Sequence, residues 1–338
     1  MNLKFICNNC GKYYNIDTWN YKCNCGGLFS LKGKIDKTNI SMDLGAGNTP
    51  LFKKEFFGNN IFFKMDFLQP TGSFKDRGAV FLIDQLKKMG IKRIIEDSSG
   101  NAGAAIAAYS AAADINCSIY LPAKTSKSKI AQIKAYGADI VKIEGDRDKT
   151  TKAILKEAKN KYYASHIYNP LFFGGVASLA YEIKDEIGIP DKIIVPVGNG
   201  TMLLGLYYGF REIGELPELI AVQSENCSPI YDNFYGIISN SKKYDNCNKT
   251  IAEGIAIGQP KRLKDIIRVL KKTNGDVIIV SEKEIKMALD KLWKKGIYVE
   301  KTSAVAPAGF IKYSNKRNSI REEKIVLPLT GSGLKNNK

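Results

Sequence analysis

The stretch PTGSFKDRG, residues 70–78, holds one lysine in a loop of turn-forming residues, just where a helical pattern begins. Lys75 falls in the first turn of that helix, where the helix dipole disfavours a cation. An amine kept in such a place can act as a nucleophile or a base. The chain has 51 lysine and arginine residues, so Lys75 alone is weak evidence for a reactive amine. The residues of the other loops decide whether it has a chemical role.

Three more loops carry glycines and small polar residues after apolar runs. EDSSGNAGAA (96–105) offers N–H groups and hydroxyls that suit a carboxylate or phosphate, although helix capping by serine is the simpler explanation. In PVGNGTMLLG (196–205), the N–H groups of residues 198–202 can converge on an anion. In PLTGSGLK (328–335), Thr330 and Ser332 provide hydroxyls.

These four loops together suit pyridoxal phosphate. An amine can react with its aldehyde, a glycine loop can hold its phosphate, and a hydroxyl can meet its ring nitrogen. The glycine loops match neither the Rossmann nor the P-loop pattern, which argues against a dinucleotide or a nucleoside triphosphate. The carboxylate of an amino-acid substrate would then bind at the serine–asparagine loop.

The elements that must position these loops alternate along the chain. Strands are expected at 61–67, 91–96, 117–122, 138–145, 191–197, 219–223, 276–280 and 324–329. Helices are expected at 74–90, 101–113, 126–138, 148–160, 200–214, 281–296 and 302–313. Such alternation predicts an α/β fold with parallel sheets covered by helices, and it places the loops at the carboxyl ends of strands, where ligands bind.

Composition limits the other possibilities. The 338 residues are enough for two domains, and no apolar run approaches the length of a membrane span. The N-terminus lacks the layout of a secretory signal, so a cytoplasmic location is expected. The net charge of +17 comes from lysines scattered over helix surfaces, so neither a nucleic acid nor a membrane is an expected partner.

Four of the seven cysteines lie within the first 25 residues, in the patterns CNNCG and CNCGG. An odd cysteine count without a sign of export argues against a disulfide framework. Cys7, Cys10, Cys23 and Cys25 instead suggest a structural zinc site, the alternative being a knuckle that folds without metal. The remaining cysteines are expected at ordinary core or surface positions: Cys117, Cys227 and Cys247.

The order of motifs resembles that of the fold-type II pyridoxal-phosphate enzymes, and within them the threonine synthases. The motifs are GNTPL, PTGSFKDRG, SSGNAG, PVGNGT, AEGIAIGQP, EKTSAVAPAG and LTGSGLK. The resemblance covers residues 43–334 and implies the two-lobed, tryptophan synthase β-like fold and a homodimer. The cysteine knuckle resembles the amino-terminal extension that many threonine synthases carry.

The resemblance also implies roles for single residues. Lys75 would form the Schiff base with the cofactor, Asn101 would hydrogen-bond its ring hydroxyl, and Thr330 would meet its pyridine nitrogen. Its phosphate would be held by Gly198, Asn199, Gly200, Thr201 and Met202. The substrate would be contacted by Ser98, Ser99, Ala102 and Asn169.

The implied reaction converts O-phosphohomoserine and water to threonine and phosphate, so the expected substrate is a phosphorylated amino acid. One segment departs from the family. Where threonine synthases have a sequence resembling NPFRLEGQK, this chain has NPLFFGGVA, with Phe172 in place of the arginine. Losing an arginine removes a bidentate, charge-assisted contact to phosphate. His166, the only histidine, lies close by and is expected to have a structural or solvent-facing role.

Several alternatives stay open. Another pyridoxal-phosphate enzyme of elimination or replacement would explain the missing arginine: a threonine dehydratase, a cysteate synthase or a cysteine synthase that uses O-phosphoserine. The AEGIAIG segment resembles its counterpart in threonine dehydratases. A zinc-ribbon nucleic-acid binder would explain the cysteines and the charge but not the lysine or the glycine loops. A catalytically dead regulatory homologue would not need Lys75.

The expected domain organisation has three parts. Residues 1–30 form the cysteine knuckle. Residues 31–75 and 165–338 form the larger cofactor-binding lobe, and residues 76–164 form the smaller lobe.

Overall fold

The computed structural model describes residues 3–35, 40–41, 44–145, 147–237, 247–315 and 322–336. The chain forms two compact units: a first unit of residues 1–47 and 69–176, and a second unit of residues 48–68 and 177–337. These limits differ from the lobe boundaries expected from the sequence, which stay a prediction. In the part of the chain described, no helix is both long and apolar enough to cross a membrane.

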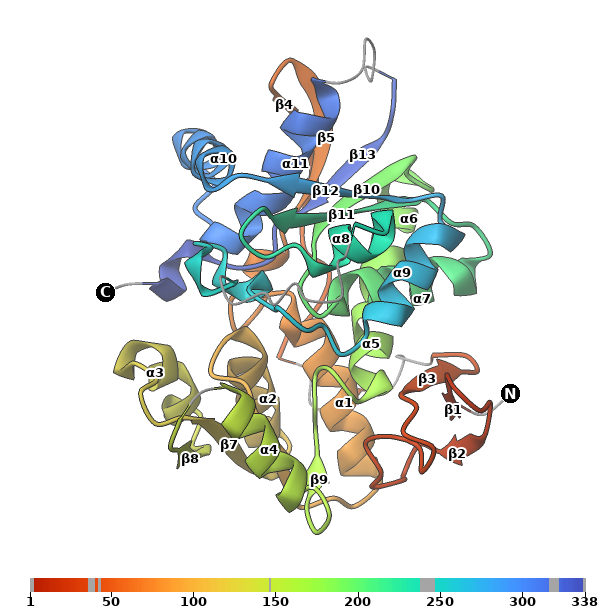
Figure 1. The fold of residues 1–338 in the computed structure, drawn as a ribbon, viewed down its shortest axis with the longest axis vertical. Coiled ribbons are helices and arrows are strands. Elements are labelled where there is room, and N and C mark those ends of the chain that lie inside the picture. The colour runs from red at the N-terminus through yellow and green to blue at the C-terminus, as the bar shows by residue number, and fades with distance from the viewer. Residues whose placement is uncertain are drawn as a thin grey trace. The chain divides into compact units, whose positions relative to one another are not determined.

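The second unit is built on a six-stranded sheet in the order β12-β11-β10-β13-β5-β4 (Figure 1). Its strands are β4 (Leu51–Phe56), β5 (Asn59–Lys64), β10 (Lys192–Pro196), β11 (Glu218–Ser224), β12 (Asp276–Val280) and β13 (Ile325–Pro328). Every neighbouring pair is parallel except β4 with β5. β13, and β10 after its first residue Lys192, are continuous apolar runs, and both strands are buried throughout, as expected for central strands of a parallel sheet.

Helices cover both faces of this sheet. α10 and α11 lie on one side, and α7, α8 and α9 lie on the other (Figure 1). The helices of the second unit are α6 (Ser178–Ile187), α7 (Thr201–Ile213), α8 (Pro229–Tyr235), α9 (Leu263–Lys272), α10 (Glu282–Lys294) and α11 (Val305–Ser314). Ser281 and Glu284 form a capping box at the start of α10, which fixes where that helix begins.

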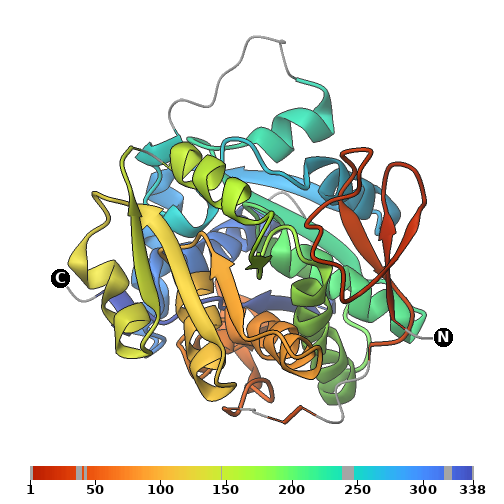
Figure 2. The ribbon, with the colours of Figure 1, turned by 90° about the horizontal axis from the view of Figure 1, so that it is seen from below.

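The first unit contains a four-stranded parallel sheet in the order β8-β7-β6-β9. Its strands are β6 (Arg93–Glu96), β7 (Asn116–Pro122), β8 (Asp139–Ile143) and β9 (Tyr162–Tyr163). Its helices are α1 (Lys75–Lys88), α2 (Asn101–Ala112), α3 (Lys127–Ala135), α4 (Arg147–Glu157) and α5 (Pro170–Val176). Figure 2 shows α4 on one side of these strands and α1 and α2 on the other.

The first unit also holds a small antiparallel sheet, drawn in red in Figure 2. It consists of β1 (Lys4–Cys7), β2 (Tyr13–Asn15) and β3 (Phe29–Lys32) in the order β2-β1-β3. Tyr21, in the loop between β2 and β3, packs edge-on against Tyr163 and Tyr168. The cysteine knuckle is therefore packed into this unit by aromatic contacts.

The expected α/β fold with helix-covered parallel sheets is confirmed, but one cysteine prediction is wrong. Cys227 and Cys247 form a disulfide with a Cα–Cα distance of 4.5 Å. The two positions are 20 residues apart, and sequence spacing alone does not reveal that the fold brings them within bonding distance. The third position behaves as expected, since Cys117 is a buried thiol in β7.

Candidate active site

Lys75 is the first residue of α1, and its side chain is half-buried with Nζ 3.9 Å from the centre of the Phe74 ring. The turn before the helix is held by Asp76, whose carboxylate accepts a hydrogen bond of 3.0 Å from the Thr71 backbone N–H. Gly72 in that turn has a φ of +80°, a conformation that favours glycine. These features of the turn thus fix Lys75 at the amino-terminal end of α1.

The serine–asparagine loop leads from β6 into α2 in the same unit. Gly100 is the cap residue of α2, and its N–H donates to the Ser98 hydroxyl at 3.3 Å. Gly103 packs on the carbonyl of Ser98 so closely that any Cβ would collide with it. Ser98 and Ala102 are buried, and Asn101 is half-buried. The loop therefore packs closely against the first turn of α2.

The glycine loop of the second unit joins β10 to α7. Gly200 caps α7 with a φ of +80°, and a Cβ at Gly198 would lie 3.0 Å from both Ile255 Cα and Ile257 Cγ1. The first N–H groups of a helix have no partner within it, and the dipole there favours an anion. A phosphate fits this donor set, so the loop suits the phosphate of pyridoxal phosphate.

Thr330 follows β13 in the second unit and is buried. Its hydroxyl lies 3.1 Å from the hydroxyl of Ser303, which accepts a 2.8 Å hydrogen bond from the Gly331 N–H. Ser303 therefore orients Thr330. Ser303 lies inside the EKTSAVAPAG motif, but nothing in the sequence pattern indicated this contact.

The segment that departs from the family forms α5, and each of its seven residues is buried. Asn169 caps it: the side-chain oxygen accepts from the Leu171 N–H at 3.1 Å, and the amide nitrogen donates to the Tyr162 hydroxyl at 3.0 Å. Asn169 thus has a structural role in this unit, and its predicted contact with substrate stays a prediction.

Phe172, at the position of the family's arginine, is fully buried against α1. Its ring lies where a side chain at Gly78 would stand, and Gly78 is one helical turn beyond Lys75. Gly175 likewise approaches the Arg77 carbonyl too closely for any Cβ. Packing between α1 and α5, rather than a polar pocket, thus occupies this position.

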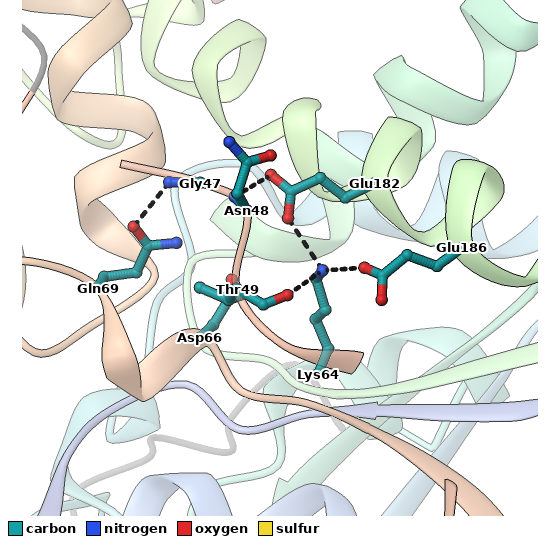
Figure 3. A network of polar contacts seen from close by, with 8 residues as sticks. All are labelled: Gly47, Asn48, Thr49, Lys64, Asp66, Gln69, Glu182 and Glu186. Carbon is teal, nitrogen blue, oxygen red and sulfur yellow. Dashed lines mark hydrogen bonds and ion pairs between the residues drawn. The ribbon is translucent and has the colours of Figure 1, made fainter. Parts of the chain in front are cut away.

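Sequence reasoning missed a second buried lysine, Lys64, at the end of β5. It forms ion pairs with Glu182 at 3.0 Å and Glu186 at 2.7 Å, both on α6, and donates to the Thr49 carbonyl at 2.5 Å (Figure 3). Glu182 also accepts from the Asn48 N–H at 2.9 Å. Lys64 therefore anchors the GNTPL motif to α6, and its full set of partners marks it as structural.

The four N-terminal cysteines form a candidate metal centre. Their sulfur atoms all lie within 4.8 Å of one another, a separation suited to four thiolates around one zinc ion. The Tyr14 hydroxyl, 3.1 Å from the Cys23 sulfur, and after it the Cys25 backbone lower the pKa of the Cys23 thiol to about 6. The four cysteines grouped from the sequence thus lie together despite the short spacing between Cys23 and Cys25, and their role as zinc ligands stays a prediction.

Within the first unit, the structure places Lys75, Ser98, Ser99, Asn101 and Ala102 at the amino-terminal ends of α1 and α2, two helices that pack together. Within the second unit, it places the loop of residues 198–202 at the start of α7 and Thr330 after β13. The roles assigned to these residues stay predictions.

Comparison with known proteins identifies the family. The family described as "Pyridoxal-phosphate dependent enzyme" matches residues 42–331. The threonine synthase of Methanocaldococcus jannaschii is 31% identical, with 97% of this chain and 92% of that protein covered. The threonine synthase of a Bacillus species is 32% identical, covering 89% and 87%.

A solved structure of a pyridoxal 5'-phosphate-dependent aspartate racemase has the same fold. Its TM-score is 0.73 at 24% identity, over 86% of this chain and 91% of that one. The family match and the threonine synthase relatives indicate a pyridoxal-phosphate-dependent lyase. The chain belongs to the pyridoxal-phosphate dependent enzymes of fold type II.

Proposed function

We propose that this protein is a threonine synthase, which converts O-phosphohomoserine and water to threonine and inorganic phosphate. The observation that carries the proposal is the similarity to threonine synthases along 97% of the chain, with the lysine, serine–asparagine and glycine loops all present. The charge of +17 also favours a phosphorylated substrate.

We propose a role toward the cofactor for each residue that the family resemblance singles out. Lys75 would bind its aldehyde carbon, and Asn101 would donate to its ring hydroxyl. The N–H groups of residues 198–202 would bind its phosphate, and Thr330, oriented by Ser303 at 3.1 Å, would meet its ring nitrogen. Pyridoxal phosphate supplies an electron sink that stabilises negative charge on the carbons of a bound amino acid.

The remaining chemistry belongs to the chain's own groups. The Lys75 amine would move protons among the substrate carbons. Ser98 and Ser99 would bind the substrate carboxylate. Because Thr330 offers a neutral hydroxyl rather than a carboxylate, it would leave the ring nitrogen largely unprotonated, which favours elimination and replacement over transamination.

A second candidate is a pyridoxal-phosphate enzyme of elimination or replacement whose substrate has a different leaving group, such as a threonine dehydratase. The packing of Phe172 favours it, because an apolar, buried α5 cannot provide the charge-assisted contacts that a departing phosphate needs. Cysteate synthase and O-phosphoserine-type cysteine synthase reactions are further replacement reactions, but O-phosphoserine also loses a phosphate, so the packing of Phe172 does not favour it as a substrate.

Other features of the proposal are less central to the reaction. We propose that the four cysteines hold a structural zinc ion, that the protein works as a homodimer, and that it is cytoplasmic. A nucleic acid is not part of the proposed function, because the basic residues are spread over helix surfaces.

Product analysis tests the proposal. The protein loaded with pyridoxal phosphate is incubated separately with O-phosphohomoserine, with threonine, and with O-phosphoserine and sulfide. Threonine and phosphate in equal amounts from the first substrate would support the synthase. If threonine yields 2-oxobutyrate and ammonia, or O-phosphoserine yields cysteine, while O-phosphohomoserine is unchanged, the second candidate replaces it.

A further inference from the structure

Two consecutive carboxylates stand where β6 leads into the serine–asparagine loop: Glu96 is the last residue of the strand, and Asp97 follows it. Glu96 is fully buried, and Asp97 is half-buried. A buried carboxylate is costly unless hydrogen bonds satisfy it, so its partners report what the fold needs to hold in place. Both residues have partners elsewhere in the first unit.

Glu96 binds the only histidine of the chain. His166 Nδ1 donates to Glu96 Oε1 at 2.5 Å, and both side chains are buried. His166 is therefore not solvent-facing. It lies two residues beyond Ala164, whose N–H donates to the Ile95 carbonyl of β6 at 3.0 Å. The bond thus ties the turn that follows β9 to the end of β6.

Asp97 also accepts hydrogen bonds from other parts of the first unit. The Tyr163 hydroxyl donates to Asp97 Oδ1 at 2.5 Å, and the Thr151 hydroxyl of α4 donates to Oδ2 at 3.0 Å. Burial raises the pKa of Tyr163 well above its usual value, and the Asp97 carboxylate raises it further, so the phenol stays a donor. The last two residues before Ser98 are therefore held from β9, from α4 and from the turn after β9.

The neighbours of His166 connect it to α1, the helix that begins at Lys75. Its ring meets the ring of Phe172 edge-on, with centroids 6.1 Å apart, and Phe172 packs on Gly78 of α1. Cys117, on the neighbouring strand β7, is an uncharged thiol, because burial raises its pKa to about 12. His166 thus lies between the base of the serine–asparagine loop and the packing of α5 against α1.

We propose that Glu96 and His166 form a positioning pair that holds Ser98, Ser99 and the N–H of Gly100 in the geometry that binds the carboxylate of the substrate amino acid. The pair does not touch the substrate. It acts through the backbone, because Ser98 is two residues from Glu96. The proposal rests on the proposed function, since it takes this loop as the carboxylate site.

The variants separate the hydrogen bond from the packing. His166→Asn keeps a donor near the position of Nδ1 and serves as the conservative control. His166→Phe keeps the aromatic contact with Phe172 but removes the donor. Since a buried carboxylate left alone can unfold a protein, Glu96→Leu with His166→Phe removes both partners, which is often tolerated.

Hydrogen exchange of the holoenzyme gives a readout that needs no substrate. Peptides covering residues 97–103 are expected to exchange faster in His166→Phe and in the double variant, and as in the parent protein in His166→Asn. Peptides over α7 serve as an internal control. Unchanged exchange at residues 97–103 in the double variant would overturn the proposal.

Ligand binding then tests the carboxylate itself. L-threonine and L-threoninol, which lacks the carboxylate, are titrated into the holoenzyme and followed by its visible absorption. The double variant should bind L-threonine roughly 10- to 150-fold more weakly, the equivalent of one hydrogen bond to a charged group. Its affinity for L-threoninol should not change, and His166→Asn should restore the L-threonine affinity.

The outcomes separate this proposal from the proposed function. Equal weakening for both ligands would mean a general structural role and would overturn the positioning role. If the parent protein forms no coloured complex with pyridoxal phosphate, the proposed function fails, and this proposal, which depends on it, fails with it. If O-phosphohomoserine alone proves inert, the test with L-threonine still decides on the pair.

Discussion

The start of α7 and the helix α5 are the two places where the family resemblance puts a phosphate, and they differ in chemistry. At α7, the loop of residues 198–202 offers backbone N–H groups at a helix start, with Gly200 in the left-handed conformation. At α5, every residue is buried and the side chains are apolar or absent. The backbone donors expected to bind the cofactor phosphate are present, whereas the segment expected to bind a substrate phosphate forms a buried apolar helix.

The contrast between α7 and α5 indicates which residue roles of the family can be carried over to this chain. Phosphate binding by backbone N–H groups depends on chain conformation, which the glycines of the PVGNGT motif preserve. Phosphate binding by side chains depends on residue type, and Phe172 stands where the arginine would be. The chemistry that belongs to the cofactor is therefore better supported than the identity of the substrate.

The largest expected effect is the loss of Lys75. Lys75→Ala removes the amine that would bind the cofactor and move protons, so kcat should fall by at least about 10²–10⁴-fold. The cofactor should still bind through the loop of residues 198–202. Steady-state kinetics and cofactor titration check both parts, with Lys87→Ala, on the exposed face near the end of α1, as the matched control.

Full activity of Lys75→Ala would contradict the proposed cofactor chemistry, because catalysis would then not need the Lys75 amine.

Phe172→Ala should lower the free energy of unfolding by about 3–5 kcal/mol, because it leaves a cavity between α1 and α5. Urea unfolding measures the change. Tyr13→Ala, at a position 53% exposed, should cost less than about 0.5 kcal/mol.

Phe172→Arg sharpens the same contrast. A guanidinium at this position would be buried beside Gly78, so this variant should also be destabilised and should not bind O-phosphohomoserine more tightly. A stable Phe172→Arg variant with a lower KM for the phosphorylated substrate would show that α5 borders the leaving group after all.

Gly198→Ala tests the other side of the comparison. The new Cβ would crowd Ile255 and Ile257, so the loop or these neighbours must give by a few tenths of an ångström. Overpacking of about 1–3 kcal/mol corresponds to roughly 5- to 150-fold weaker cofactor binding. Absorbance titration of the apoprotein measures the affinity.

Gly214→Ala, at the other end of α7, is the control. Its φ of +99° makes alanine unfavourable, but no heavy atom lies within 4 Å of the new Cβ. It should lower stability without changing cofactor affinity. Equal affinities for both variants would mean that the loop shape does not matter.

The smallest effect on catalysis is expected from the cysteine knuckle. A chelator that removes metal from the four thiolates should speed hydrogen exchange across β1 to β3 and leave kcat nearly unchanged, because the sheet has its own hydrophobic core around Phe5 and Phe29. Metal content and kcat are measured on the same sample. A large loss of activity would mean that catalysis depends on the fold of the knuckle.

The positions of several helices and of the glycine loops could be predicted from the sequence, because they depend on patterns of neighbouring residues. Apolar periodicity located α1, α2, α7, α10 and α11 to within a few residues, and glycine loops marked the starts of α2 and α7. Other features depend on distant contacts. β9 has only two residues, too few for any periodic signal, and the Glu96–His166 bond joins residues 70 apart.

The burial of Lys64 and the disulfide between Cys227 and Cys247 were invisible for the same reason. A lysine at a strand end reads as exposed until two glutamates of a helix more than a hundred residues later are placed beside it. No helix was expected at α5, since only the packing of its aromatic and glycine residues on α1 shows that they belong to a buried helix.

The most direct test of the central claim is the visible spectrum of the purified protein with pyridoxal phosphate, recorded while amino acids are titrated in. The proposal predicts a yellow band that depends on Lys75 and shifts with O-phosphohomoserine at lower concentrations than with threonine or O-phosphoserine. A band that ignores O-phosphohomoserine and responds to one of the others would contradict the synthase assignment. The absence of any band would contradict the cofactor chemistry itself.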